Sequence, residues 1–146
     1  MIRVVKMRRV DAPFVATMIE RRWDYTREQS WSVVRDYLSK DSDTVCFVAK
    51  DGPIHIGLGA FHVNNDIGVD LHPWCVGLWV DKDYRGRGIG WRITRRRFVY
   101  ARFLGYTKIY LDTVSAEKYH KKFGWKKLDI EAYNQGSRTV IMEHDL

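Results

Sequence analysis

The sequence has few cysteines, few prolines and no long hydrophobic run. Only Cys46 and Cys75 are cysteines among its 146 residues, and both lie in apolar segments without the CxxC or Cys/His spacing of a zinc site. We therefore expect buried free thiols, a reducing compartment and no structural metal. No stretch approaches the roughly 18 apolar residues that a membrane helix requires, so no membrane partner is expected.

Signal-peptide features, internal repeats and linkers are also lacking. The first ten residues, MIRVVKMRRV, are too charged to hold the apolar region of a signal peptide. With 45% hydrophobic and 14% aromatic residues, the chain is large enough to bury a core. We therefore expect one domain over residues 1–146, a cytoplasmic location, and a monomer or homodimer.

Acidic residues are outnumbered by basic ones. The chain has 25 Lys and Arg against 18 Asp and Glu, a formal net charge of +7. This excess favours a polyanionic ligand, although a basic surface without any partner is the simpler alternative.

The apolar periodicity predicts the order β-α-α-β-β-β-α-β-α-β-β. Asp11 is the expected cap of the first helix. Such an order is typical of an α/β protein with a mixed, mostly antiparallel sheet flanked by helices on both faces, with ligands near the carboxyl ends of strands. The expected strands are 2–7, 45–49, 54–63, 74–80, 107–113, 125–130 and 138–144, and the expected helices are two within 11–38, one from RGRGIG to about 104, and one over 115–123.

The most informative segment is the loop that follows strand 74–80. Its sequence RGRGIG, residues 85–90, opens a long helix whose first backbone N–H groups have no intrahelical partner and therefore form an anion site. Gly86, Gly88 and Gly90 let the backbone approach a diphosphate and adopt positive φ. Arg85 and Arg87 add positive charge for the same ligand.

Other phosphate motifs do not fit this loop. The pattern GxxxxGK[ST] is absent, and the dinucleotide pattern GxGxxG lacks its third glycine. A dinucleotide motif also follows the first strand, whereas this loop follows the fourth. An ordinary glycine-rich turn is the remaining alternative.

Two motifs resemble those of the GNAT family of N-acetyltransferases. Arg85, Gly88 and Gly90 match the pattern Arg/Gln-x-x-Gly-x-Gly/Ala, within a longer match over 80–90 in which Lys82 replaces a proline. The second motif is the helix end HKKFGW, residues 120–125, which resembles aromatic-x-x-Leu/Phe-Gly-aromatic. The family resemblance covers most of the chain, with the first forty residues matching only in type.

The resemblance implies acetyl-CoA bound in a V-shaped opening between strands 74–80 and 107–113. It also implies pantetheine pairing with the first of these strands and pyrophosphate resting on the helix amides. The implied cofactor-binding residues are Leu78, Trp79, Val80, Arg85, Gly86, Arg87, Gly88, Ile89, Gly90 and Trp91.

The reaction needs a neutral amine, donors for the developing oxyanion and a proton for the departing thiolate. For the oxyanion donor, the resemblance implies a backbone N–H around residues 78–80. For the acid, the family position holds His120, with Tyr119 one residue earlier, and only one of the two can face the sulfur. The motif register favours His120, whose imidazolium with a pKa near 6.5 protonates a thiolate downhill. A histidine that only packs at the helix end is the alternative.

The general base is open, because Val76 stands where many relatives carry a glutamate and the strand WCVGLWV has no carboxylate. We rank His72 first, and water is a further alternative. The other candidates are Asp70, His62, Asp24 and Glu20. An acceptor pocket could be walled by aromatic and histidine side chains, although core packing explains most of them equally well. These are Trp23, Tyr25, Trp31, Phe61, His62 and Trp74.

The helix from Trp91 is rich in arginine. A solvated face is its simplest interpretation. Contact with the 3′-phosphate of CoA or with a nucleic acid such as aminoacyl-tRNA is the alternative, and a nucleic-acid partner is not favoured. We expect an N-acetyltransferase acting on a primary amine of a small molecule or peptide. The alternatives are a non-catalytic CoA- or nucleic-acid-binding module and a toxin-like acetyltransferase acting on aminoacyl-tRNA. The arginines are Arg92, Arg95, Arg96, Arg97 and Arg102.

Overall fold

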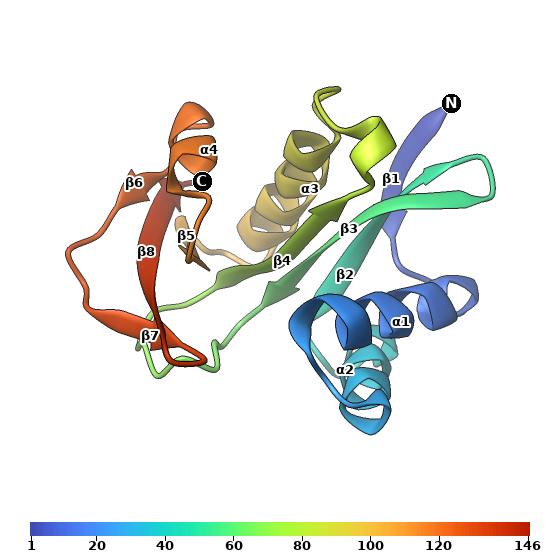
Figure 1. The fold of residues 1–146 in the computed structure, drawn as a ribbon, viewed down its shortest axis with the longest axis horizontal. Helices are drawn as coiled ribbons and strands as arrows, with labels where there is room; N and C mark the ends of the chain where they lie inside the picture. Colours follow the sequence, from blue (N-terminus) through green and yellow to red (C-terminus); the bar gives the residue numbers. More distant parts are fainter.

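A computed structural model describes residues 1–146, and its strands form one twisted sheet in the order β1-β2-β3-β4-β5-β8-β6, with β7 paired to β8 (Figure 1). The elements are β1 (Ile2–Lys6), η1 (Arg9–Asp11), α1 (Ala12–Trp23), α2 (Arg27–Leu38), β2 (Val45–Asp51), β3 (Ile54–His62), β4 (Trp74–Val80), η2 (Lys82–Tyr84), α3 (Ile89–Phe103), β5 (Lys108–Thr113), α4 (Glu117–Lys122), β6 (Lys126–Lys127), β7 (Ala132–Asn134) and β8 (Ser137–Asp145).

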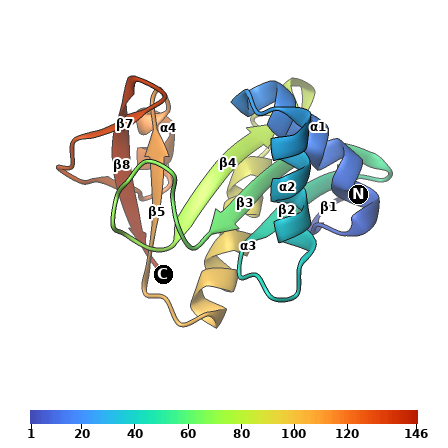
Figure 2. The same cartoon turned by 90° about the horizontal axis from the view of Figure 1, so that it is seen from below.

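The sheet is mixed and mostly antiparallel, with β4 and β5 as its parallel pair. Seen from below, α1 and α2 cover one face of the sheet and α3 lies on the other (Figure 2). This arrangement confirms the expected fold class. None of the helices is long and apolar enough to cross a membrane.

Strand β2 shows how the sequence produces two cores. Its residues are buried from Val45 to Lys50, and successive side chains point to opposite faces. Phe47 and Ala49 join the cluster under α3, whereas Cys46 and Val48 join the cluster under α1 and α2. Because both faces of β2 are buried, its sequence is continuously apolar instead of alternating between apolar and polar residues, as it would in a half-exposed strand.

The C-terminal region differs from the sequence-based prediction. The expected strand 125–130 is reduced to β6, because Trp125 turns into the core and the chain leaves β8 after Leu128, whose N–H donates to the Ile141 carbonyl. It returns as β7, which the sequence analysis missed. Gln135 and Gly136, at φ 50° and 80°, form the turn between β7 and β8, and positive φ at both positions matches the twist of a hairpin.

Asp11 is a second correction. It stands before α1 but its side chain does not cap that helix. The carboxylate is fully buried, accepts a hydrogen bond from the Arg8 N–H, and lies 3.0 Å from Lys50 Nζ and 2.8 Å from His55 Nε2. These contacts lower the pKa of Asp11 against the effect of burial, so a compensated buried charge ties η1 to β2 and β3.

Strand β4 carries a bulge in its middle. The register of β3 and β4 shifts between Gly59 and Ala60, opposite Gly77, which has φ 57°. Only glycine adopts this conformation without strain, and a bulge bends the strand locally. The bulge divides β4 into a half that begins beside β5 and a half that leads to η2.

His62, at the end of β3, is partly buried and its Nε2 lies 2.8 Å from the hydroxyl of Tyr37, a buried residue of α2. Burial lowers the pKa of His62 to about 4. The folded protein therefore holds this ring in its neutral form at neutral pH.

This burial predicts an acid-dependent loss of stability. Between pH 6.5 and 4, His62 binds a proton in the unfolded chain but not in the folded protein. As the pH is lowered through this range, His62 therefore lowers the free energy of unfolding by up to roughly 3 kcal/mol. Urea unfolding at pH 7.5, 6.0, 5.0 and 4.5 measures the slope. His62→Gln should flatten it, while Asn64→Gln at a nearby exposed, non-titrating position should retain the wild-type slope. Equal slopes for wild type and His62→Gln would contradict the prediction.

Candidate active site

The site begins where β4 and β5 part. These parallel strands are paired only at Trp74 and Tyr110, with one further bond from the Tyr110 N–H to the Pro73 carbonyl. From Val76 onward, β4 has no strand partner on that side. Parallel neighbours that diverge leave backbone donors and acceptors for a ligand.

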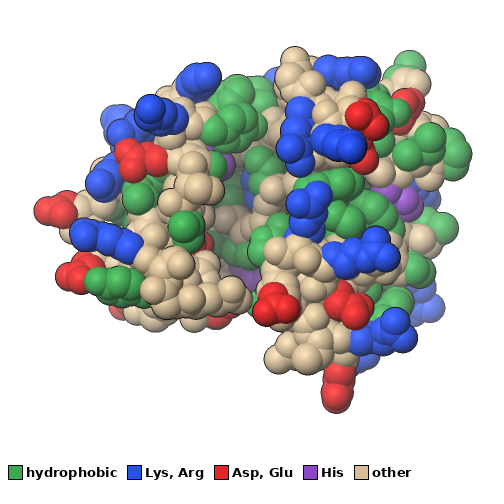
Figure 3. Space-filling view, viewed as in Figure 1, with side chains coloured by type: hydrophobic (Ala, Val, Ile, Leu, Met, Phe, Trp, Pro, Cys, Tyr) green, Lys and Arg blue, Asp and Glu red, His purple; other side chains and the backbone are tan.

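The surface is hollowed between the half of the molecule that carries β4 and the half that carries β5, β8 and α4 (Figure 3). Lys and Arg side chains border the upper part of this hollow, on the side where η2, the start of α3 and α4 lie. The positive border favours an anionic ligand entering from that end.

The loop before α3 has the backbone that a phosphate cradle requires. Gly86 and Gly88 have φ 78° and 75°, and a Cβ on either would meet no atom within 4 Å. Gly88 caps α3 in the left-handed conformation, and no side chain bonds to the first N–H groups of the helix. The loop therefore fits a pyrophosphate by its conformation, its open space and its free donors.

The two arginines of the loop bind backbone carbonyls of the residues that precede it. Arg85 Nε donates to the Val80 carbonyl at 2.9 Å, and Arg87 donates to the Asp83 carbonyl while its guanidinium lies 5.0 Å from the Tyr84 ring centroid. Tyr84 in turn donates to Asp51 Oδ2 at 2.7 Å. Both arginines remain exposed, so their charge reaches a ligand on the loop.

The remaining cofactor-binding candidates occupy different positions. Leu78, Trp79 and Val80 lie on the part of β4 beyond the bulge, beside the opening. Ile89 is 2% exposed, so only its backbone can contact a ligand. Trp91 stacks on Phe123 with ring centroids 5.0 Å apart, which joins α3 to the end of α4.

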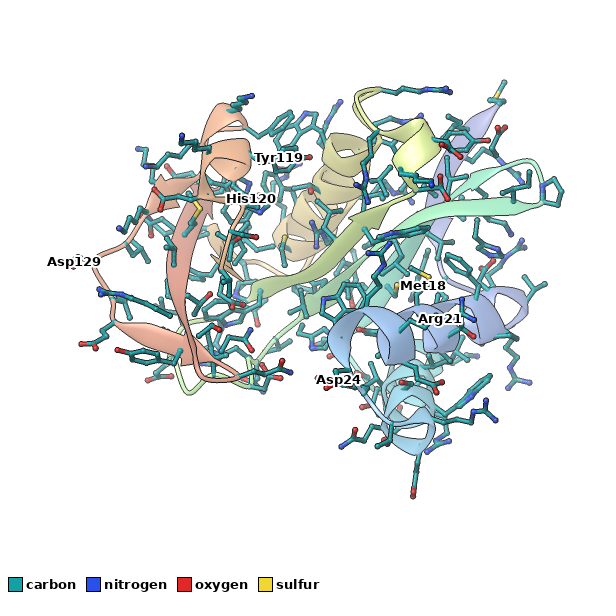
Figure 4. The ribbon with its side chains drawn as sticks, viewed as in Figure 1. Met18, Arg21, Asp24, Tyr119, His120 and Asp129 are labelled. Atoms are coloured by element: carbon teal, nitrogen blue, oxygen red, sulfur yellow. The ribbon has the colours of Figure 1, made fainter.

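Tyr119 and His120 lie on the side of α4 that faces α3 (Figure 4). The Tyr119 hydroxyl is so close to Gly90 that a Cβ there would stand 2.8 Å from it. Tyr119 therefore lies at the phosphate loop. His120 is more buried, packs 6.1 Å from the Trp125 ring, and forms no hydrogen bond through its ring.

The electrostatics of His120 correct one expectation. Burial, helped by the charge of Arg97, lowers the pKa of His120 to about 4. The ring is therefore neutral at pH 7 rather than the imidazolium with an ordinary pKa that the sequence suggested. Burial raises the pKa of Tyr119, which makes the phenol a weaker acid than usual.

Two of the aromatic candidates border β4 from the α1 side. The Trp23 indole covers the bulge, where a Cβ on Gly77 would meet it at 3.0 Å. Tyr25 follows the end of α1, and its hydroxyl lies 3.5 Å from Asp66. Asp24, labelled at the corner of α1 and α2 in Figure 4, is exposed and lies across the molecule from Tyr119 and His120.

Trp74 does not wall a pocket. It is 1% exposed and packs with Tyr110, Ala132 and Ile141, so it contacts no substrate. Phe61 is likewise fully buried. Both aromatic side chains pack in the hydrophobic core.

The histidines proposed for the acceptor side are both hydrogen-bonded. His62 is held by Tyr37, as described above. His72 has Nδ1 2.9 Å from the Val63 carbonyl and Nε2 3.2 Å from Asp70. A neutral imidazole has one N–H and can donate to only one of these two oxygens, so the other ring nitrogen must move away from the oxygen it faces before it can take a proton from an amine.

Arg97 departs from the solvated arginine face expected for this helix. It is 2% exposed, whereas Arg95 and Arg96 are exposed. Its spacing of four from both Ile93 and Ala101, which are buried, was the available signal.

Solved structures of similar fold cover almost the whole chain. A GNAT-family protein from Desulfovibrio desulfuricans matches with TM-score 0.75 and 14% identity, covering 99% of both chains. Arabidopsis thaliana NAA60 in complex with a bisubstrate analogue matches with TM-score 0.74 and 15% identity over 99% of this chain and 98% of that one. An aminoglycoside 6′-N-acetyltransferase complexed with coenzyme A matches with TM-score 0.76 and 15% identity over 98% and 96%.

Sequence comparison is more specific. No curated protein matches the sequence. The model of the Acetyltransferase (GNAT) family matches residues 11–125, which include the phosphate loop, α4 and the bulged strand β4. The chain therefore belongs to the GNAT family of acetyltransferases, enzymes that use acetyl-CoA as the acetyl donor.

Proposed function

We propose that this protein transfers the acetyl group of acetyl-CoA to a primary amine of a small molecule or peptide, by direct attack in a ternary complex. The observation that carries the proposal is the opening between β4 and β5, which leads from the phosphate loop at the start of α3 to the bulge at Gly77. We also propose that residues 1–146 act as a single catalytic domain. The buried free thiols of Cys46 and Cys75 support a cytoplasmic location.

Different residues along this opening would bind the cofactor and the acceptor. When bound, acetyl-CoA supplies an activated thioester. The loop amides of 86–91, with Arg85 and Arg87, would hold its pyrophosphate, and the backbone of Leu78 and Val80 would hold its pantetheine amides. Trp23 and Tyr25 would border the acceptor amine on the opposite side of β4.

The neutral imidazole of His120 suits it to move the proton. As the amine nitrogen bonds to the acyl carbon and the C–S bond breaks, one proton must pass from nitrogen to sulfur. A neutral ring can accept that proton, and a protonated ring whose pKa is about 4 gives it readily to a thiolate. His120 would thus serve as base and then acid in one turnover, a role that needs no carboxylate on β4. His72 remains a predicted base for deprotonating the incoming ammonium, once its bond to Asp70 opens.

An amine panel tests the function directly. Purified protein with acetyl-CoA should release free thiol faster with at least one acceptor class than with buffer alone. The panel holds a polyamine, an aminoglycoside, a free amino acid, peptides with a free N-terminus or lysine, and aminoacyl-tRNA. CoA binding without any acceptor-dependent release would support the non-catalytic alternative, and release only with aminoacyl-tRNA would identify a nucleic-acid substrate.

The phosphate loop can be tested by Gly88→Glu. A carboxylate at this left-handed cap adds backbone strain and repels the pyrophosphate, so the affinity for CoA should fall at least about 100-fold. Isothermal titration gives the dissociation constant. Gly136→Glu is the matched control, because Gly136 has φ 80° and open space around it but lies in the β7–β8 turn. Retained affinity in Gly88→Glu with a folded domain would refute the cradle.

The proton path can be tested by comparing two adjacent residues. His120→Ala should lower kcat by about 100-fold or more, since the proton carrier is lost. Tyr119→Phe should change kcat by less than about 5-fold and act mainly on the KM for acetyl-CoA, since its hydroxyl lies at Gly90. Steady-state kinetics with the best acceptor measure both. The reverse ranking of kcat would assign the proton to Tyr119.

A further inference from the structure

Arg97 is a buried cation in the middle of the fold. It lies in the apolar stripe of α3 with Ile93 and Ala101 and faces the sheet at Gly59, where a Cβ would stand 3.3 Å from the guanidinium carbon. The glycine on β3 thus leaves room for the Ile93 side chain, which a Cβ would meet at 2.7 Å, and for the guanidinium beside it.

The guanidinium has no counter-ion. One terminal nitrogen donates to the Ala60 carbonyl at 3.1 Å and to the Gly77 carbonyl at 3.3 Å, and the other donates to Thr94 Oγ1 at 2.9 Å. Its Nε has no partner, and no carboxylate forms an ion pair with it. Burying an unpaired charge carries a large desolvation penalty, and an apolar side chain of similar length would fill the same space without it.

The carbonyl that Arg97 binds belongs to the bulge of β4. In a trans peptide, the Gly77 C=O and the Leu78 N–H point in opposite directions. The Asp81 N–H donates to the Ile56 carbonyl, so these two residues form a hydrogen-bonded pair. Hydrogen-bonded and non-hydrogen-bonded pairs alternate along an antiparallel ladder. Trp79 and Leu58 are therefore a hydrogen-bonded pair, whereas Leu78 and Gly59 are not. The Leu78 N–H therefore points away from β3, toward the opening between β4 and β5.

We propose that Arg97 is a positioning residue that fixes the bulge and, by binding the Gly77 carbonyl, strengthens the Leu78 N–H as the donor to the acyl oxygen. The inference rests on the proposed function. A charged donor on one side of a peptide group polarises it, so its N–H on the other side becomes a better donor. The charge also stabilises negative charge that develops on the acyl oxygen and the departing thiolate, in a region of low dielectric.

Burial is the main cause of several pKa shifts in the fold, and the charge of Arg97 modifies them. Arg97 contributes to the lowered pKa of His120 and opposes the raised pKa of Tyr119 on α4. It likewise opposes the raised pKa of Cys46, of Cys75 and of Tyr37. In each case the positive charge favours the less protonated form, which is the response expected of groups lying within its field.

Arg97→Met tests the inference in steady-state kinetics. It should lower kcat by about 10- to 100-fold, while the KM for acetyl-CoA changes less than about 2-fold, because Arg97 acts through the backbone of β4. Arg96→Met removes the same charge from the adjacent exposed position and should behave as wild type. An unchanged kcat in a folded Arg97→Met variant overturns the inference. An inactive wild-type protein would contradict the proposed function as well.

Two further variants separate charge from packing if Arg97→Met does not fold. Arg97→Lys keeps the charge, and Arg97→Gln keeps a planar donor without it. We expect Arg97→Lys to retain about 10-fold more kcat than Arg97→Gln, and equal or reversed values would overturn the role of the charge.

A readout without turnover is the pKa of His120, followed by NMR in the cofactor-free protein. It should rise in Arg97→Gln and stay unchanged in Arg97→Lys and Arg96→Met. A purely structural role for Arg97 predicts no difference in the His120 pKa between Arg97→Gln and Arg97→Lys. An unchanged His120 pKa in Arg97→Gln overturns the proposed effect of the Arg97 charge on His120.

Discussion

The parting of β4 from β5 is the constraint around which the rest of the structure is organised. Parallel strands that diverge after one residue pair leave several backbone groups without partners, which a sheet interior cannot tolerate unless a ligand or water binds them. The two halves of the sheet then depend on helices for their connection. α3 packs under β2, β3 and β4 on one side, and the Trp91–Phe123 stack joins it to α4 on the other. The Trp91–Phe123 stack thus adds to the core contacts that join the two sides of the opening.

Positive charge reaches this opening in two different ways. At its upper end, Arg85, Arg87 and the free amides of α3 are exposed, so their attraction for phosphates is screened by salt and acts mainly on binding. Below it, Arg97 is shielded from solvent, and its field is correspondingly stronger. One helix therefore supplies a binding charge at its N-terminus and a buried charge two turns later.

The sequence allowed the conformation of the phosphate loop to be predicted, because single glycines determine the backbone there. A glycine such as Gly88 at a helix start implies both a backbone geometry and an exposed set of donors. The buried part of the site could not be predicted in the same way. An arginine among other arginines does not show whether it faces water, and Arg97 differs from Arg96 only in the direction it takes from α3. Trp74 was misassigned because its cover, β7, is too short to show a pattern.

The missing carboxylate on β4 and the buried Arg97 are best understood together. Val76 packs with the cluster under α1 and α2, whereas Arg97 lies on α3 at the other face of the sheet, and no carboxylate on β4 neutralises the guanidinium. The same cation and the same burial keep His120 neutral. A neutral imidazole, unlike a carboxylate, becomes positively charged when it takes the proton, so it releases that proton most readily to a thiolate leaving beside a fixed positive charge.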